Sequence, residues 1–510
     1  MLTRRETLAA GAVGAAGLLL PLPPALARRQ KRPLAAAGTF PAGVASGEPT
    51  LQGITLWAQV GGIERTSRLL IEVARDSGFE RVVHRQGVLA RDVHGFAAKT
   101  RVDSPRMKPG EEYFYRFSTR TTVSPPGRFV TARPAGSLEP LRIGFFSCQQ
   151  YEAGFYTAHR SLAAEHCDLI VCLGDYIYEH NGDQGIEGRA DESSEAENGQ
   201  SETLAEYRAK YALYRSDPDL QAMHASAPMI ATWDDHEVED NHAGTTAGTT
   251  ADRRLDYAKR RENAYQVYFE QMPQRRIRAE RDRVYRRLRL GGLVDLLMLD
   301  ERQYREDQPC NDTPILPCPE NTAPRTMLGE RQKAWLKRRL EDQTAAWRVL
   351  GSSVEWMSWD SAPPLALNQD GWDGYQAERA EILEHAAARG TKDIAVITGD
   401  THQFKCGQLT TTGRTGGTPV GVEFIGGSVT SRCVEQLEQA GELANREMLL
   451  ANPHWRFVHF QRRGYSVMDV SPEALAVRFM SPPDVRDPAS PVEQLAAFRV
   501  ARGTADVEPA

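Results

Sequence analysis

The sequence lacks a strong bias of charge or hydrophobicity, and each absence excludes a class of protein. Its 510 residues carry 62 Lys and Arg against 68 Asp and Glu, a formal net charge of -6. Because excess positive charge is what holds phosphate backbones, we expect no nucleic-acid partner. Beyond residue 27 there is no apolar run of the roughly 20 residues that a membrane-spanning helix needs. The composition, 41% hydrophobic and 25% charged, is typical of soluble globular proteins, and the length suffices for two or more domains.

The N-terminus has the features of an export signal. Arg4-Arg5 precedes a modest apolar stretch at 8–20, and Ala25-Leu26-Ala27 fits a small-residue cleavage pattern. Paired arginines in this position are typical of twin-arginine signals. A membrane anchor is the alternative, but the stretch is shorter than a spanning helix requires. We therefore predict a cleaved signal at 1–27, the Tat export machinery as a partner, no stable membrane anchor, and a periplasmic or secreted location.

Cysteine is scarce, and its count is odd. Seven cysteines in an exported chain leave at least one thiol unpaired or bound to another group. Cys310 and Cys318 bracket a loop with prolines and are predicted to form a short disulfide. Cys406 and Cys433 can also pair, although nothing in their local sequence supports it. The two cysteines that flank the apolar segment 168–171 are predicted to be buried thiols.

The chain divides into an all-β part and an α/β part. Residues 39–133 contain short alternating strands separated by turn residues, which predicts a small β-sandwich of the Ig or fibronectin type. Over residues 140–482, apolar strands alternate with helical segments, which predicts an α/β domain. Residues 483–510 are expected to be a C-terminal tail. The acidic segment 191–198 is expected to be a solvated loop, with a lid over a site as the alternative.

Side chains able to bind metals follow four of the predicted strands. Ser147-Cys148-Gln149 ends the first, and Gly174-Asp175-Tyr176-Ile177-Tyr178 ends the second. The other two strands end in Trp233-Asp234-Asp235-His236-Glu237 and Gly399-Asp400-Thr401-His402. Because the carboxyl ends of parallel strands share one edge of a sheet, these groups can converge. A single aspartate after a strand is often a helix cap, but four such motifs in chain order favour a metal site.

The residue types in these motifs suit a cation of high charge. Carboxylates bind hard ions such as calcium, magnesium and iron(III). Tyrosine and cysteine bind only as anions, which a highly charged metal favours by lowering their pKa. Asp175 and Tyr178 stand three apart, so both can face one ion, and Asp175 is the best candidate for a carboxylate that bridges two. Hydrolysis of a phosphate ester needs an activated hydroxide and positive charge beside the phosphoryl oxygens, which such a site can provide.

The motifs resemble those of the metallophosphoesterase superfamily, to which the purple acid phosphatases belong. Asp235 stands where the superfamily's Gly-Asn-His block has asparagine, and Asp400 replaces the first histidine of its Gly-His-x-His block. Together with Leu299-Asp300-x-Arg302-Gln303-Tyr304-Arg305 and the segment 43–49, these departures resemble the PhoD-like alkaline phosphatase D family. The similarity extends over about residues 39–480. It implies a metallophosphoesterase-like α/β sandwich domain after the small β-sandwich.

The resemblance also implies a role for each motif residue. The residues expected to hold iron(III) are Cys148, Asp175, Tyr178 and His402. Those expected to hold calcium are Asp175, Asp235 and Asp400. His236 is expected to face the substrate, as a phosphate contact or as the acid for the leaving group. Arg302 is expected to bind a phosphate oxygen as a fork donor.

One ligand of the superfamily pattern is missing. Metallophosphoesterases usually supply a further metal ligand after the strand that here spans Trp347–Leu350. Gly351-Ser352-Ser353-Val354-Glu355 follows that strand, without histidine or asparagine. Glu355 can substitute only if its side chain faces the site, so the second metal's ligand set stays open.

These features favour an exported, monomeric phosphatase that acts on phosphate monoesters and also on diesters. A phospholipase D-like or nucleotide-directed phosphodiesterase on the same metals is the first alternative. A non-catalytic protein that binds metal or a cell-envelope polymer through its β domain is the second. The intact set of metal motifs disfavours this last alternative.

Overall fold

The described part of the chain is almost complete after the first 31 residues. The computed structural model describes residues 32–182, 186–194, 196–277, 279–312, 318–362, 365–366 and 368–510. It separates the unit Met1–Pro33 from the unit Leu34–Ala510, which holds all the elements below. The predicted signal at 1–27 lies outside the described residues. In the described residues, no helix is both long enough and apolar enough to cross a bilayer.

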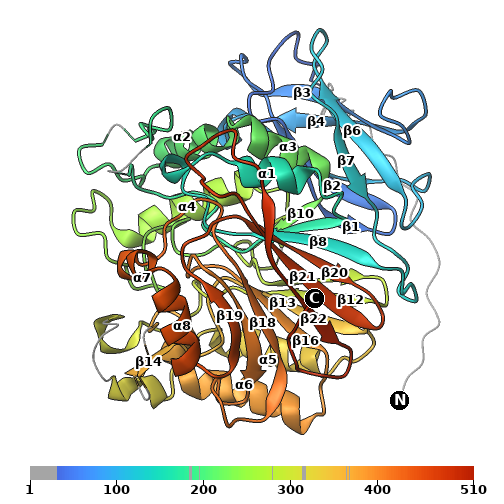
Figure 1. Ribbon diagram of the computed structural model, residues 1–510. Helices are drawn as coiled ribbons and strands as arrows, with labels where there is room; N and C mark the ends of the chain where they lie inside the picture. Colours follow the sequence, from blue (N-terminus) through green and yellow to red (C-terminus); the bar gives the residue numbers. More distant parts are fainter. Residues whose placement is uncertain are drawn as a thin grey trace, which may run out of the picture. The chain divides into compact units, whose positions relative to one another are not determined.

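The N-terminal part of the larger unit is all-β, as predicted (Figure 1, blue). Its two antiparallel sheets have the strand orders β1-β2-β5 and β4-β3-β6-β7. The strands are β1 Val44–Thr50, β2 Gly53–Gln59, β3 Ser67–Ala74, β4 Val82–Ala90, β5 Ala97–Asp103, β6 Glu112–Ser118 and β7 Gly127–Val130. Leu56 of β2, Ile71 of β3 and Tyr115 of β6 point into one core between the sheets, which makes this part a small sandwich.

Two seven-stranded sheets form the centre of the α/β part. Their orders are β10-β9-β8-β20-β21-β22-β23 and β11-β12-β13-β16-β18-β17-β19. The strands of the first sheet are β8 Leu141–Phe146, β9 Leu169–Cys172, β10 Met229–Ala231, β20 Tyr465–Val470, β21 Ala474–Ser481, β22 Glu493–Ala501 and β23 Glu508–Pro509. Those of the second are β11 Arg286–Leu290, β12 Val294–Met298, β13 Trp347–Ser352, β16 Ile394–Thr398, β17 Phe404–Thr410, β18 Pro419–Gly426 and β19 Trp455–His459. Strands β8, β9 and β10 pair in parallel, as do β12, β13, β16 and β18.

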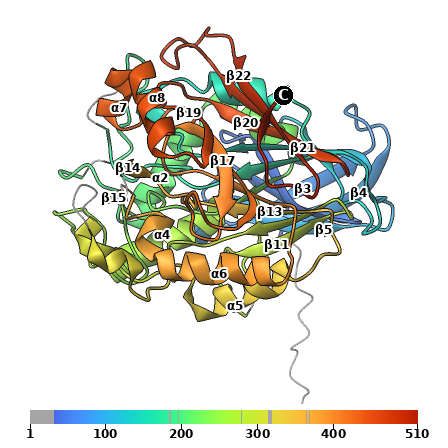
Figure 2. The ribbon, with the colours of Figure 1, turned by 60° about the horizontal axis from the view of Figure 1, so that its bottom comes forward.

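The two sheets pack face to face, with helices on their outer faces (Figures 1 and 2). Val171 of β9 and Ile397 of β16 share the core between the sheets. Cys172, the next residue of β9, instead packs among the helices on the outer face. Leu336 of α5 and Ile382 of α6 cover the second sheet. Because both faces of the strands are buried, the strands are continuous apolar runs, and the expected α/β sandwich is confirmed.

The described helices span α1 Thr157–Ala163, α2 Leu204–Arg215, α3 Pro218–Ser226, α4 Tyr257–Gln271, α5 Gly329–Leu340, α6 Gln376–Ala388, α7 Glu435–Ala440 and α8 Glu442–Ala451. Among them, α2, α3 and α4 start at a side-chain cap. At the start of α2, Thr203 and Glu206 each accept a bond from the other's backbone amide, which forms a capping box. Asp217 caps α3, and Pro218 occupies its first position. A small hairpin, β14 Asp360–Ala362 and β15 Leu365–Ala366, completes the strands.

One expectation about an irregular segment is wrong. Residues 493–501, expected in a tail, form β22, which pairs with β21 and buries Phe498 and Val500 between the sheets. The strand signal was the alternation of these two apolar residues with polar ones. The described residues of the acidic segment form a loop, as expected, with Glu192 and Glu197 exposed. Asp191 anchors this loop, because its carboxylate lies 2.7 Å from Nζ of the buried Lys210.

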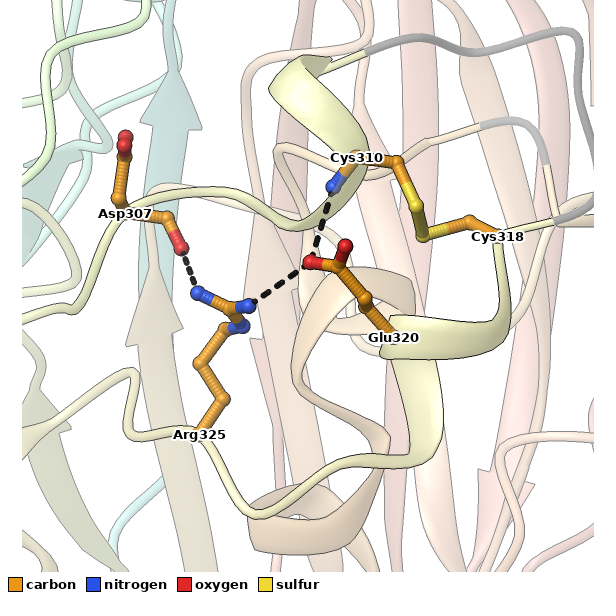
Figure 3. Close-up of a disulfide and its surroundings, with 5 residues drawn as sticks. All are labelled: Asp307, Cys310, Cys318, Glu320 and Arg325. Atoms are coloured by element: carbon orange, nitrogen blue, oxygen red, sulfur yellow. Dashed lines mark hydrogen bonds and ion pairs between the residues drawn. A yellow bond between two sulfur atoms is a disulfide. The ribbon is translucent and has the colours of Figure 1, made fainter.

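The cysteines follow the prediction. Cys310 and Cys318 form a disulfide that closes a loop whose residues 313–317 lie outside the described ones (Figure 3). Arg325 ties this loop to its neighbour, because it donates to the carbonyl of Asp307 at 2.6 Å and pairs with Glu320 at 3.3 Å. The other five cysteines are free and buried, so Cys406 does not pair with Cys433.

Candidate metal centre

The four motifs meet at the carboxyl ends of strands from both sheets. Cys148 follows β8, Asp175 follows β9 and Asp235 follows β10, all in the first sheet. Asp400 and His402 follow β16 of the second sheet. Because the sheets face each other, their strand ends lie opposite one another, and the predicted convergence occurs across the two sheets as well as along one edge.

The backbone bends sharply at the motif residues. Cys148, Asp175, Asp400 and His402 all have φ between 53° and 65°, in the left-handed region. This conformation costs a non-glycine residue on the order of 1–3 kcal/mol and is concentrated at functional sites. Beside them, Gly174 has φ of 108°, and a Cβ there would come within 2.4 Å of Cβ of Asp234. The strained bends turn the metal-competent side chains inward.

Four side chains form what we call the thiolate cluster: Cys148, Asp175, Tyr178 and His402. Cys148, Asp175 and His402 each offer one ligand atom, and these three atoms lie within 4.8 Å of one another. The hydroxyl of Tyr178 donates to Oδ2 of Asp175 at 3.0 Å and lies 3.2 Å from Nε2 of His402. Asp175 also belongs to a second such group with Asp235 and His236. A carboxylate shared by two groups has the position that a bridging ligand needs.

Neighbouring groups hold the thiolate cluster in place. The buried carboxylate of Glu237 accepts bonds from the backbone amides of Asp175 at 3.1 Å and Tyr176 at 2.7 Å, which fixes the turn after β9. The ring nitrogen Nδ1 of His402 lies 2.6 Å from the carbonyl of Arg432. This contact leaves Nε2 of His402 directed at Tyr178, as a ligand nitrogen requires.

A second set of acidic residues, which we call the carboxylate cluster, surrounds one arginine. Its members are Asp234, Asp235, Asp370 and Asp400 around Arg302. The guanidinium of Arg302 is fully buried and binds Asp370 through two nitrogens, at 2.9 Å and 2.7 Å, and Asp234 through Nε. It lies 3.6 Å from Asp235 and 3.9 Å from Asp400. Carboxylates therefore occupy the guanidinium of Arg302, which disfavours its predicted role as a phosphate contact.

The pKa values of these side chains are shifted because carboxyl groups are buried close together. Burial, followed by repulsion from Asp235, raises the pKa of Asp175 well above its usual range. Burial and the nearby Asp234 do the same for Asp400. Burial also raises the pKa of the Cys148 thiol and lowers that of His402 to about 4, so this imidazole is neutral. Buried carboxyl oxygens, a thiol and a neutral imidazole are a donor set that fits metal cations.

His236 differs from the other motif residues because it faces a carboxylate outside both clusters. Its Nδ1 lies 2.7 Å from Oε2 of the buried Glu179, and its ring lies 4.1 Å from that of Tyr178. Burial alone lowers the pKa of His236, but Asp235, Glu179 and Asp175 raise it well above the usual range. With 14% of its side chain exposed, His236 is a charged imidazole at the edge of the centre.

The position of the missing ligand is occupied by an ion pair. Glu355 lies 2.5 Å from Nζ of Lys405, and both side chains are buried. Nζ of Lys405 also lies 3.9 Å from the ring centre of Trp455. Among the described residues, Glu355 belongs to none of the groups of metal-competent side chains. Asp370, which sequence reasoning missed, reaches the centre from a loop and not from a strand end, so no motif pointed to it.

Comparison with known proteins agrees with this geometry. Models of the PhoD-like phosphatase and of its N-terminal domain match residues 143–479 and 25–133. The chain belongs to the PhoD-like phosphatase family. Alkaline phosphatase D of Bacillus subtilis (strain 168) is 34% identical over 481 residues, which are 90% of this chain and 80% of that protein. Family membership makes this chain a phosphoric ester hydrolase.

Solved structures support the same assignment for the fold. A structure of PhoD matches with a TM-score of 0.83 and 31% identity, over 94% of this chain and 93% of that one. A purple acid phosphatase from yellow lupin (Lupinus luteus) seeds matches with a TM-score of 0.56 and 13% identity, over 92% and 75%. At that identity the lupin enzyme shows a shared fold alone. The chain therefore has the fold of PhoD and shares its fold with a purple acid phosphatase.

Proposed function

We propose that this PhoD-like phosphatase is exported and hydrolyses phosphate monoesters and diesters at the two clusters. The observation that carries the proposal is Asp175, which belongs to two groups of metal-competent side chains at once. In this proposal iron(III) is held by Cys148, Asp175, Tyr178 and His402. Calcium is held by Asp175, Asp235 and Asp400. When bound, the two metals supply Lewis-acid activation of water and neutralise charge on the phosphoryl group.

The protein's own residues divide the remaining work. His236 is placed to give a proton to the leaving oxygen, because its imidazole is charged and partly exposed. Glu179 orients that ring through Nδ1 and stabilises its charge. Arg302 binds no substrate in this scheme. It holds the carboxylates of Asp234 and Asp370 apart and fixed.

A cavity next to the thiolate cluster offers room for the rest of a substrate. It has a volume of 330 Å³, and Thr430, Arg432 and Arg463 line it. Thr430 and Arg432 flank Ser431, whose Oγ lies 2.7 Å from the Tyr178 hydroxyl. Arg432, which lines the cavity, also contacts the centre, because its carbonyl lies 2.6 Å from Nδ1 of His402. Export rests on the twin-arginine pattern at residues 1–27, and we expect a monomer.

Hydrolysis of p-nitrophenyl phosphate and of its bis-ester, with and without a chelator, tests the proposal. Activity on both esters that the chelator removes, and that iron with calcium restores, is the expected result. The ratio of the two rates gives the preference for monoesters or diesters. Absence of activity on either ester in protein loaded with both metals would refute the proposal.

A further inference from the structure

A third group of metal-competent side chains lies beside the centre without belonging to either cluster. Its members are Glu179, His180 and His236, and one ligand atom of each lies within 4.8 Å of the others. The rings of His180 and His236 are 5.7 Å apart. His180 has no part in the function proposed above, so the group needs a separate explanation.

The backbone of this group is held firmly. The carbonyl of His180 accepts a bond from Nζ of Lys210 at 2.9 Å, and Lys210 is a fully buried residue of α2. His180 also forms an isolated bridge with Gln200. Glu179 is buried, and its Oε1 accepts from the backbone amide of Asp240 at 3.1 Å. The carboxylate and the His180 backbone are thus in place before any ion binds.

The donor chemistry differs from that of the main centre. Two imidazoles and one carboxylate are a set that zinc prefers, whereas calcium prefers oxygen ligands only. Both histidine side chains are partly exposed, so an ion can reach them from solvent and keep a water as its fourth ligand. In the described structure, Oε2 of Glu179 lies 2.7 Å from Nδ1 of His236, so these two ligand atoms face each other where the ion would bind.

We propose that Glu179, His180 and His236 form an inhibitory site for zinc. Zinc binds Nδ1 of His236 in place of a proton, which leaves to solvent, and the contact to Glu179 becomes a shared metal ligand. With Nδ1 of His236 bound to zinc, Glu179 no longer holds the ring through the contact of 2.7 Å, and the ring is displaced from the orientation in which it faces the leaving oxygen. The inhibitory part rests on the proposed function, whereas the binding part stands on the three ligands alone.

Equilibrium dialysis of zinc with the enzyme loaded with iron and calcium tests the binding. The wild type is expected to take up one zinc per chain beyond its resident metals, while its iron and calcium contents stay constant. His180→Asn is expected to weaken this binding at least about tenfold, because an amide is a poor zinc ligand. His166→Asn, at an exposed histidine elsewhere, is the matched control and should bind like the wild type. Equal zinc binding by all three proteins would overturn the site.

Zinc X-ray absorption identifies the ligands. Two imidazole nitrogens at about 2.0–2.1 Å are expected, and a sulfur neighbour at about 2.3 Å would show that zinc instead replaces the metal at Cys148. Inhibition of ester hydrolysis should follow the same zinc concentrations as binding and shift with His180→Asn. Zinc binding without inhibition of an active enzyme would overturn the inhibitory role. An enzyme inactive before zinc is added would contradict the proposed function, while dialysis would still decide the site.

Discussion

The two halves of the centre are built in different ways. The thiolate cluster combines four residue types whose polar atoms approach one another directly, as Tyr178 and Asp175 do at 3.0 Å. The carboxylate cluster has one residue type, and a buried cation, Arg302, stands between Asp234 and Asp370. One half therefore lacks a cationic side chain among its members, whereas the other contains its own counter-charge.

This difference shows what offsets the cost of burying charge in each cluster. Buried anions without a partner are costly, so the thiolate cluster depends on a metal to be ionised. In the carboxylate cluster, attraction to Arg302 and Arg305 overcomes the effect of burial and lowers the pKa of Asp370 to about 2. We expect loss of metal to destabilise the thiolate cluster more. We expect loss of Arg302 to destabilise the carboxylate cluster more.

Asp175→Asn should have the largest effect, because Asp175 belongs to the thiolate cluster and also to the group with Asp235 and His236. An amide cannot carry the negative charge that a bridge between two cations requires. We expect both metals to be lost. We expect kcat/KM to fall about a thousandfold or more, which corresponds to several kcal/mol of transition-state stabilisation by the metals. Elemental analysis and the p-nitrophenyl phosphate assay measure this. Retention of both metals would contradict the proposal that Asp175 is a ligand to both.

Cys148→Ala should affect the thiolate half alone. We expect iron and about two orders of magnitude of activity to be lost, while calcium is kept. A visible absorption band from thiolate and tyrosinate on iron(III) should disappear at the same time. Cys167→Ala, at a buried thiol before the start of β9 and so at the end of that strand away from the motif, is the control and should keep the band. A variant of Cys148 that stays coloured and active would remove cysteine from the ligand set.

Arg302→Gln should affect the carboxylate half. It leaves Asp234 and Asp370 without their counter-charge, and breaking a buried ion pair costs about 3–5 kcal/mol of unfolding free energy. We expect lower stability in urea and weaker calcium binding, with the iron band kept. Arg189→Gln breaks the buried pair with Asp217 elsewhere and serves as control. It should lower stability but leave calcium in place, and an equal calcium loss in both variants would contradict the role of Arg302.

The smallest effect should come from the disulfide, which lies in neither half. Replacing Cys310 and Cys318 by serine opens a loop of sequence separation 8. Such a loop contributes about 2–3 kcal/mol at most. We expect faster proteolysis near residue 310 with unchanged metal content. Loss of either metal would show that the loop, whose neighbour Gln308 donates to Asp370 at 2.8 Å, also organises the carboxylate half.

The thiolate half could be predicted from sequence because each of its residues follows an apolar strand, and strand ends in such folds converge. The fold class was predictable for the same reason, since strands such as β9 are continuous apolar runs. The burial of Arg302 was not predictable, because an arginine after a strand looks the same whether it meets phosphate or carboxylate. Asp370 was missed because a loop, with no periodic pattern, carries it to the centre.

Elemental analysis of purified, active protein tests the central claim most directly. If the two clusters form a mixed-metal centre that shares Asp175, active protein should contain about one iron per chain together with calcium. A chelator should remove metal and activity in parallel. A fully active preparation that contains neither iron nor calcium would contradict the account.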